Sequence, residues 1–256
     1  MLIAVDMGNT NITLVIFDQD QIIAEYRLTT KLQRTSDEYG FMINSFLDVY
    51  NVKVEQIEDV IISSVVPKIM HAFTNAIKKY LNQDPIIVGP GIKTGIKLKI
   101  PNPKGLGADR LVDAVGAYNT YKRACLVIDF GTATTFDVVD GDGCFLGGAT
   151  STGIQVMCQA LAAQAAMLPE FEIAMPPNVI AKETVPSMQA GCIIGYIGLT
   201  EKLITEIKKE FGSELLVVST GGLGRVISSE TDLIDIYDRN LTYKGLKMIY
   251  DKNKYQ

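Results

Sequence analysis

Short apolar runs separated by polar turns open the chain. Residues 4–28 read as an apolar strand that ends in Asp6, a turn that contains Gly8, a second β-branched strand, a polar turn at residues 18–20 and a third strand. Strands joined by turns this short pair in antiparallel fashion. The pattern therefore predicts an antiparallel meander of three strands.

The same order of elements returns in the second half of the chain. Residues 127–150 again read as a strand that ends in an acidic residue, Asp129, followed by a turn with Gly131 and two further strands. Asp-Gly pairs at residues 140–143 supply the positive φ angles that tight hairpins need. Because the whole unit of strands and turns is repeated, we expect two duplicated domains.

Helices and strands follow the first meander in alternation. Residues 35–50 read as a helix that opens with Thr35 and Glu38 at the spacing of a capping box. A strand at residues 60–65 and a helix at residues 67–81 come next. We expect these elements to extend and cover the sheet that the meander begins.

The second half continues in the same way. Helical patterns cover residues 153–167 and 186–211. A buried strand at residues 215–219 and a glycine turn at residues 220–222 follow them. A meander followed by alternating helices and strands gives a mixed sheet flanked by helices.

These patterns define an α/β chain of two domains. We place the boundary near residues 115–123, with an N-terminal domain at residues 1–118 and a C-terminal domain at residues 119–256. Domains of about 120 residues can each bury a core of their own. We expect a nucleotide-binding cleft between them, because the two meanders would face one another there.

Composition narrows the classes of function. Hydrophobic residues make up 47% and charged residues 21% of the chain, which is typical of a globular protein. A net charge of -5 without a long basic run leaves no electrostatic footprint for nucleic acid. The first residues lack a secretory signal, and no apolar run approaches the ~20 residues of a membrane span. We therefore expect a cytoplasmic protein with no membrane or nucleic-acid partner.

The turn of the first meander carries groups that suit phosphate. Gly8 allows close backbone approach, and the next three residues offer amides and hydroxyls to phosphate oxygens. These three are Asn9, Thr10 and Asn11. Asp6 could hold Mg²⁺ through water. The alternative is a polar hairpin turn without a ligand.

Asp129 occupies the equivalent place in the second copy. Two acidic, glycine-containing turns that face each other could hold a triphosphate and its metal. On this interpretation Asp129 binds a cation beside the phosphates; the alternative is a carboxylate satisfied by the amides of its own turn. Gly221 and Gly222 follow an apolar strand and open a helix, so an adenosine could lie against them.

A third candidate segment lies between the two meanders. The stiff stretch at residues 101–103 runs into glycine turns and then into a helix that begins with Asp109 and Arg110. Phosphoryl transfer to an alcohol needs a carboxylate that accepts the hydroxyl proton and a cation that orients an acidic substrate. Asp109 and Arg110 fit these roles. The alternative is that Asp109 caps the helix and Arg110 is its ion-pair partner.

Together these motifs resemble a known family, the type III pantothenate kinases. The motifs that carry the resemblance, in order, are Asp6-x-Gly8-Asn9-Thr10, Gly107-Ala108-Asp109-Arg110, Asp129-x-Gly131-Thr132 and Thr220-Gly221-Gly222. The resemblance spans nearly the whole chain and implies two duplicated ribonuclease H-like domains of the actin-like ATPase and sugar kinase fold. It also implies transfer of the ATP γ-phosphate to the primary hydroxyl of pantothenate, giving 4′-phosphopantothenate for coenzyme A synthesis.

The resemblance also implies roles for single residues. With the glycine turn included, the residues expected to bind ATP are Asp6, Met7, Gly8, Asn9, Thr10, Asn11, Ile12, Thr13, Thr132, Gly221 and Gly222. Those expected to bind pantothenate are Ile100, Gly107, Ala108, Asp109, Arg110 and Thr184. Asp109 is the expected general base, and Asp129 the expected ligand of the monovalent cation, potassium or ammonium, that the family uses besides Mg²⁺. The family is homodimeric, so we expect dimer contacts in the C-terminal domain.

The chain departs from the family pattern at three places. Ile100 stands where the family often has an aromatic residue, Thr152 where it has proline, and residues 182–184 replace a more usual Asn-Thr ending. Because Ile100 cannot donate a hydroxyl or stack as tyrosine does, we expect weaker or altered packing of pantothenate. Two other functions stay open: a non-catalytic ATP-binding regulator, and a kinase of the same fold for another small molecule.

Overall fold

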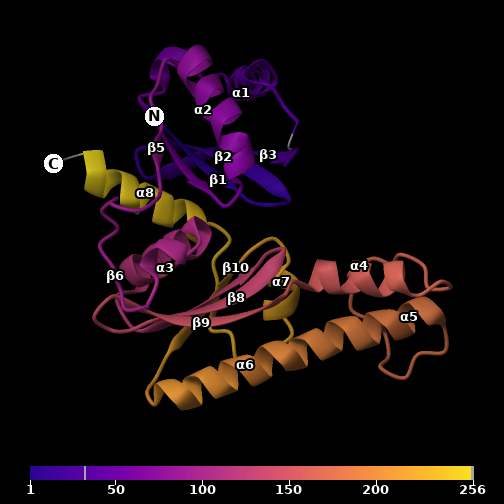
Figure 1. Cartoon of the computed structure of the whole chain (residues 1–256). Coiled ribbons are helices and arrows are strands. Elements are labelled where there is room, and N and C mark those ends of the chain that lie inside the picture. The colour runs from indigo at the N-terminus through magenta and orange to yellow at the C-terminus, as the bar shows by residue number, and fades with distance from the viewer. Residues whose placement is uncertain (32, 255–256) are drawn as a thin grey trace. The chain divides into compact units, whose positions relative to one another are not determined.

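Two compact units make up the described part of the chain, shown in Figure 1. The computed structural model describes residues 1–31 and 33–254. Unit 1 comprises Met1–Gly95, Pro101–Asn119 and the C-terminal segment that begins at Leu241. Unit 2 comprises Ile96–Ile100 and Thr120–Asn240.

Unit 1 is built on a five-stranded sheet with the order β3-β2-β1-β4-β5. Its strands are β1 Leu2–Met7, β2 Asn11–Asp18, β3 Gln21–Thr29, β4 Asp59–Ser64 and β5 Ile86–Ile87. The first three strands pair antiparallel, whereas β4 pairs parallel with β1 and β5 pairs parallel with β4. The predicted meander is therefore confirmed, and the sheet is mixed.

The helices of unit 1 begin where their sequences favour it. They are α1 Ser36–Val49, α2 Pro67–Leu81, α3 Ala108–Tyr121 and α8 Leu241–Lys254, with short 3-10 turns at Val54–Gln56 and Pro103–Gly105. The Thr35 side chain accepts from the Glu38 amide, and the Glu38 carboxylate accepts from the Thr35 amide. This is the capping box predicted for α1. Pro67 is the first residue of α2, where the missing amide proton costs no helical hydrogen bond.

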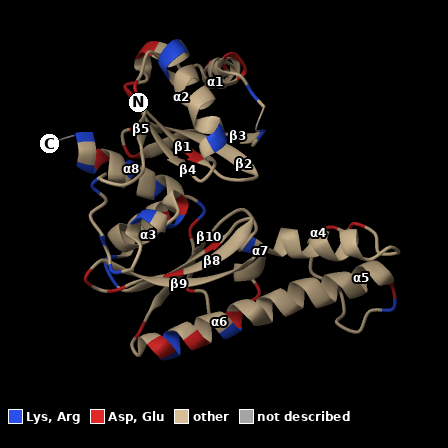
Figure 2. Ribbon diagram, in the orientation of Figure 1, with Lys and Arg blue, Asp and Glu red and all other residues tan. Residues whose placement is uncertain are grey.

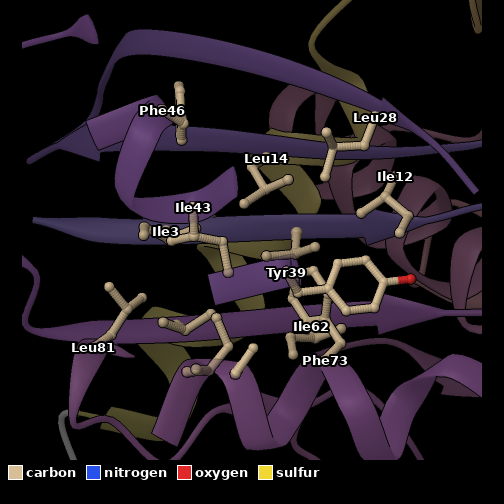
Figure 3. Packing of buried hydrophobic residues seen from close by; sticks show 14 of the residues in the cluster. Ile3, Ile12, Leu14, Leu28, Tyr39, Ile43, Phe46, Ile62, Phe73 and Leu81 are labelled. Carbon is tan, nitrogen blue, oxygen red and sulfur yellow. The ribbon is translucent and has the colours of Figure 1, made fainter. Parts of the chain in front are cut away.

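Alternate residues of the central strands build the core between the sheet and helices α1 and α2. Ile3, Ile12 and Ile62 are fully buried and pack with Phe73 of α2 (Figure 3). Ala4, which points to the opposite face of β1, is also fully buried. Both faces of the central sheet are therefore covered, which explains why these strands read as nearly continuous apolar runs.

Unit 2 repeats this architecture on a six-stranded sheet with the order β11-β10-β7-β8-β9-β6. Its strands are β6 Lys97–Leu98, β7 Cys125–Phe130, β8 Ala133–Val139, β9 Cys144–Thr152, β10 Leu216–Thr220 and β11 Ile236–Tyr237. Read from β9 to β11, the order and the strand directions are those of β3 to β5 in unit 1. The predicted duplication is confirmed by this shared topology.

The helices of unit 2 differ from the predicted ones in their bounds. They are α4 Ile154–Gln164, α5 Thr184–Gln189, a π-helical turn Ala190–Ile194, α6 Gly195–Phe211 and α7 Gly224–Ser228. The helix predicted at residues 186–211 begins earlier, at Thr184, and contains the π turn, which inserts an extra residue into the helical ladder. Within the ranges that the structure describes, no helix is both long and apolar enough to cross a membrane.

The two units are not contiguous in the sequence, unlike the division at residue 118 that we expected. Ile96–Ile100 belongs to unit 2 because β6 pairs with β9 there. The C-terminal helix α8 belongs to unit 1, where it packs on β1 and β4. Hydrogen bonding of a short edge strand and packing of a terminal helix are tertiary events, which composition along the chain does not reveal.

Helices α3 and α8 cross within unit 1 at the distance of backbone contact. A Cβ atom on Gly245 would lie 2.1 Å from the Val112 carbonyl oxygen, and one on Gly116 would lie 2.6 Å from the Leu241 carbonyl oxygen. Only glycine leaves room for two helices this close. Because Asp109 lies in the first turn of α3, the crossing fixes the helix that carries it.

Candidate active site

The predicted site residues fall into two clusters, one in each unit. The first is the hairpin between β1 and β2 in unit 1. Gly8 donates its amide to the Asn11 carbonyl at 2.9 Å, and the Thr30 hydroxyl donates to the Gly8 carbonyl at 2.7 Å. The side chains of Asn9 and Thr10 are exposed. Both hydrogen bonds thus hold the backbone of the turn at Gly8, and the side chains of Asn9 and Thr10 lie at the surface.

Asp6 lies at the base of this hairpin in a row of polar residues. Strand register pairs it with Thr13 of β2 on one side and with Ser63 of β4 on the other. Thr13 is 5% exposed and therefore buried in the sheet. Among the described residues, the buried Ser63 hydroxyl has no hydrogen-bond partner.

The segment Gly107–Arg110 belongs to the same unit as the hairpin. Gly107 accepts a hydrogen bond from the Leu111 amide at 3.1 Å, so the turn leads directly into α3. Oδ1 of Asp109 accepts from the Arg110 amide at 2.7 Å. A Cβ atom on Gly107 would lie 2.4 Å from this same oxygen. The carboxylate therefore packs against the bare backbone of Gly107, as expected of a residue at a helix N-terminus.

Val65 connects the two segments of unit 1. Its amide donates to the Met7 carbonyl at the end of β1, with a distance of 3.1 Å. Its Cγ1 atom would lie 3.8 Å from a Cβ atom on Gly107. The predicted phosphate hairpin and the predicted pantothenate segment are thus joined through one residue, which sequence reasoning had treated only as the end of a strand.

In unit 2, the carboxylate of Asp129 lies between two glycine turns. A Cβ atom on Gly221 would lie 2.6 Å from Oδ1 of Asp129, and one on Gly131 would lie 3.2 Å from Oδ2. Gly221 also has a φ angle of 92°, a conformation that side chains rarely allow. The Tyr237 hydroxyl donates to the Gly221 carbonyl at 3.1 Å and steadies this turn. Glycine is therefore required beside the Asp129 carboxylate.

Helix α4 begins at the turn that follows Asp129. Gly153, its N-cap, donates its amide to the Thr132 carbonyl at 3.0 Å. A Cβ atom on Gly153 would lie 2.2 Å from the Gly131 carbonyl oxygen. The positive end of the α4 dipole therefore points toward the exposed Thr132, an arrangement that suits an anion.

The remaining predicted residues lie in unit 2. Ile100 is half-buried after β6, and its Cγ2 atom would lie 3.9 Å from a Cβ atom on Gly147 of β9. Thr184 is exposed at the first position of α5, and Gly222 is exposed beside Gly221. Ile100 and Thr184 thus belong to unit 2, whereas Gly107–Arg110 belongs to unit 1. We had expected all of these residues to bind the same substrate.

The acidic residues fit a metal that arrives with a nucleotide. Over the described ranges, no group of three or more His, Cys, Asp or Glu side chains could hold a metal ion. Mg²⁺ in kinases needs only one or two carboxylates, because substrate phosphates and water supply the other ligands. The half-buried carboxylates of Asp6 and Asp129 match this requirement.

Comparison with solved structures defines the class. A protein from Sinorhizobium meliloti named as a 2-dehydro-3-deoxygalactonokinase has a TM-score of 0.63 at 14% identity and covers 100% of this chain and 98% of that chain. A protein from Campylobacter jejuni named as a Baf family transcriptional activator has a TM-score of 0.60 at 20% identity and covers 98% of both chains. The chain thus has the actin-like fold of ATPases and sugar kinases.

The sequence narrows this class to one family. The model of the type III pantothenate kinase family matches residues 2–206. A type III pantothenate kinase from Agathobacter rectalis is 53% identical over 253 residues, which cover 98% of this chain and 97% of that protein. One from Bifidobacterium adolescentis is 48% identical and covers 99% of both chains. The chain belongs to the type III pantothenate kinase family, as the four motifs had indicated.

Gly221→Ala should destabilise the protein, because the new Cβ atom would overlap the Asp129 carboxylate at a positive φ angle. We expect unfolding free energy to fall by about 1–3 kcal/mol, measured by chemical denaturation. Gly222→Ala is the matched control, since a Cβ atom there meets nothing within 4 Å. Equal losses for the two neighbouring variants would contradict the packing of Asp129 against Gly221.

Proposed function

We propose that this chain transfers the γ-phosphate of ATP to the primary hydroxyl of pantothenate and so forms 4′-phosphopantothenate. One observation carries the proposal beyond family membership. Val65 joins Met7 of the phosphate hairpin to Gly107, against which the Asp109 carboxylate packs. A carboxylate held beside a phosphate-binding hairpin is what transfer to an alcohol requires.

In unit 1, we assign the hairpin from Asp6 to Thr13 to the phosphates of ATP. Its glycine turn and exposed amide side chains supply hydrogen-bond donors without a Walker sequence. Asp6 would hold Mg²⁺ through water, and the bound metal would neutralise charge on the transferred phosphoryl group. The hairpin would orient the triphosphate, since positioning is the main contribution of a protein to phosphoryl transfer.

Asp109 is the proposed general base, and it would accept the proton of the pantothenate hydroxyl. Its Oδ1 is already engaged by the Arg110 amide, which orients the carboxyl group. The neighbouring Arg110 guanidinium would pair with the carboxylate of pantothenate. We assign Gly107, Ala108, Ile100 and Thr184 to the remaining pantothenate contacts.

In unit 2, we assign Asp129 to a monovalent cation, potassium or ammonium. Large monovalent cations bind oxygen ligands, and the Asp129 carboxylate lies among the backbone of two glycine turns. Thr132 at the start of α4 would contact ATP, and the exposed Gly222 with Gly221 would lie against adenosine. The presence of both Asp109 and Asp129 argues against a non-catalytic regulator, which needs neither a base nor a charge beside the γ-phosphate.

Asp109→Asn should abolish most turnover, because the amide keeps the shape but cannot accept the proton. We expect kcat to fall roughly 10²-fold or more while ATP binding is retained, measured by phosphate transfer and by calorimetry. Asp84→Asn, at a side chain that is 86% exposed, is the control and should leave both values unchanged. Near-normal turnover of Asp109→Asn would remove Asp109 from the mechanism.

Asp129→Asn should remove the dependence of the reaction on potassium. We expect the wild-type rate in potassium to exceed the wild-type rate in sodium. The variant should show the same low rate in both salts, because the neutral amide attracts a cation only weakly. The exposed Asp142→Asn, in the next hairpin of the same sheet, should keep the potassium response. Equal wild-type rates in both salts would contradict the cation assignment.

We further propose that the chain forms a homodimer through unit 2. Helix α4 carries no charged residue and is wholly tan in Figure 2. In the segment after it, Met167 is 93% and Ile180 91% exposed. Large apolar side chains with this much exposure favour burial against another protein. Light scattering should give twice the 28.0 kDa mass of one chain. Met167→Glu should shift the measured mass toward that of a single chain. A wild-type mass equal to that of a single chain would refute the dimer.

A further inference from the structure

A residue outside the phosphate hairpin, Thr30, is hydrogen bonded to the hairpin twice. Thr30 follows the last residue of β3, and strand register pairs that residue, Thr29, with Asn11 at the start of β2. The Thr30 hydroxyl donates to the Gly8 carbonyl at 2.7 Å. The Thr30 amide donates to the Thr10 carbonyl at 2.9 Å. One residue therefore holds two carbonyl groups of the turn between β1 and β2.

These two hydrogen bonds determine where the neighbouring amides point. In a planar trans peptide, the C=O and N–H bonds point in opposite directions. The Gly8 carbonyl is directed at Thr30, so the Asn9 amide proton points away from Thr30. The Asn11 amide proton also points away, because the Thr10 carbonyl accepts from Thr30. Backbone amides turned to one side of a tight turn are donors that suit an anion.

The hydroxyl bond matters most at the peptide between Gly8 and Asn9. Glycine allows more backbone conformations than any other residue, so this peptide would not keep one orientation by itself. Turned over, it would present the Gly8 carbonyl oxygen to a ligand in place of the Asn9 amide. A carbonyl oxygen repels a phosphate, whereas an amide proton attracts it. The Thr30 hydroxyl thus selects the orientation that favours phosphate.

The position of Thr30 is itself fixed by helix α1 and the turn before it. The Tyr39 hydroxyl donates to the Lys31 carbonyl at 3.3 Å, and the Arg34 guanidinium donates to the Thr29 carbonyl at 3.3 Å. Tyr39 is fully buried among the core residues of Figure 3. The carbonyl groups before and after Thr30 are therefore both anchored, which keeps its hydroxyl beside the hairpin.

We propose that Thr30 is a positioning residue of the phosphate site and directs the hairpin amides toward the phosphates of ATP. It acts through Gly8 and Thr10, whose carbonyls it holds away from the ligand, and not on the transferred group itself. None of the four motifs named above contains Thr30. The proposal rests on the proposed role of the hairpin in binding MgATP.

Thr30→Val tests the proposal, because it removes the hydroxyl and keeps the β-branched shape and the backbone amide. We expect the Kd for MgATP to rise about three- to tenfold in calorimetry, as for one lost hydrogen bond. The KM for pantothenate should stay within about twofold, since the hairpin is assigned to the nucleotide. Thr30→Ser keeps the hydroxyl and should restore the wild-type Kd to within about twofold.

Thr74→Val is the matched control, with the same chemical change at the same kind of bond. The half-buried Thr74 hydroxyl donates to the Met70 carbonyl at 2.8 Å within α2, a helix that contains none of the proposed site residues. We expect a similar loss of thermal stability from Thr74→Val and Thr30→Val, but unchanged MgATP binding for Thr74→Val. If Thr30→Val folds poorly, Thr30→Ala removes the same hydroxyl with less bulk.

Three results would overturn the proposal: wild-type MgATP affinity in Thr30→Val, equal weakening in Thr74→Val, or a Thr30→Ser protein that binds as weakly as Thr30→Val. The last result would show that the shape of the side chain matters and not its hydroxyl. Wild-type protein that binds MgATP but forms no phosphopantothenate would refute the proposed function and leave the binding test of Thr30 intact. Wild-type protein that binds no MgATP would refute both.

Discussion

Close approach of backbone at glycine positions is the constraint on which both functional clusters depend. A Cβ atom on Gly153 would overlap the carbonyl oxygen of Gly131, in the turn that follows Asp129. A Cβ atom on Gly221 would overlap Oδ1 of Asp129 itself. At Gly107 the same constraint lets the Asp109 carboxylate pack against the chain. These glycines let charged and polar groups sit against backbone amides and carbonyls, which a ligand can then share.

The duplication supplies two units of similar topology, and their equivalent carboxylates lie in different surroundings. In each unit the first strand of the meander has a carboxylate at its next-to-last position, Asp6 or Asp129, just before a glycine turn. In unit 1 the carboxylate belongs to a row of polar residues with Thr13 and Ser63; in unit 2 it lies between Gly131 and Gly221. These surroundings agree with the two ions proposed above, Mg²⁺ through water at Asp6 and a monovalent cation at Asp129.

Local patterns were sufficient to predict much of the fold. The two meanders, the capping box at Thr35 and the span of α2 from Pro67 are confirmed, because strand alternation and helix caps act over a few residues. Helix α8 was not predicted, since Gly245 interrupts its helical pattern and its contact with α3 is visible only in three dimensions. Val65 was missed for the same reason: its contact with Gly107 joins segments that lie far apart in the sequence. The roles proposed for the site residues stay predictions.

The central claim is that the hairpin of unit 1 and the adjoining Asp109 serve one phosphoryl transfer to pantothenate. Its most direct test is to supply ATP labelled in the γ-phosphate, with Mg²⁺ and potassium, to the purified wild-type protein together with pantothenate or, separately, with simple sugars. The account predicts labelled 4′-phosphopantothenate as the main product and little label on any sugar. Label on a sugar instead, or ATP binding without any transfer, would contradict it.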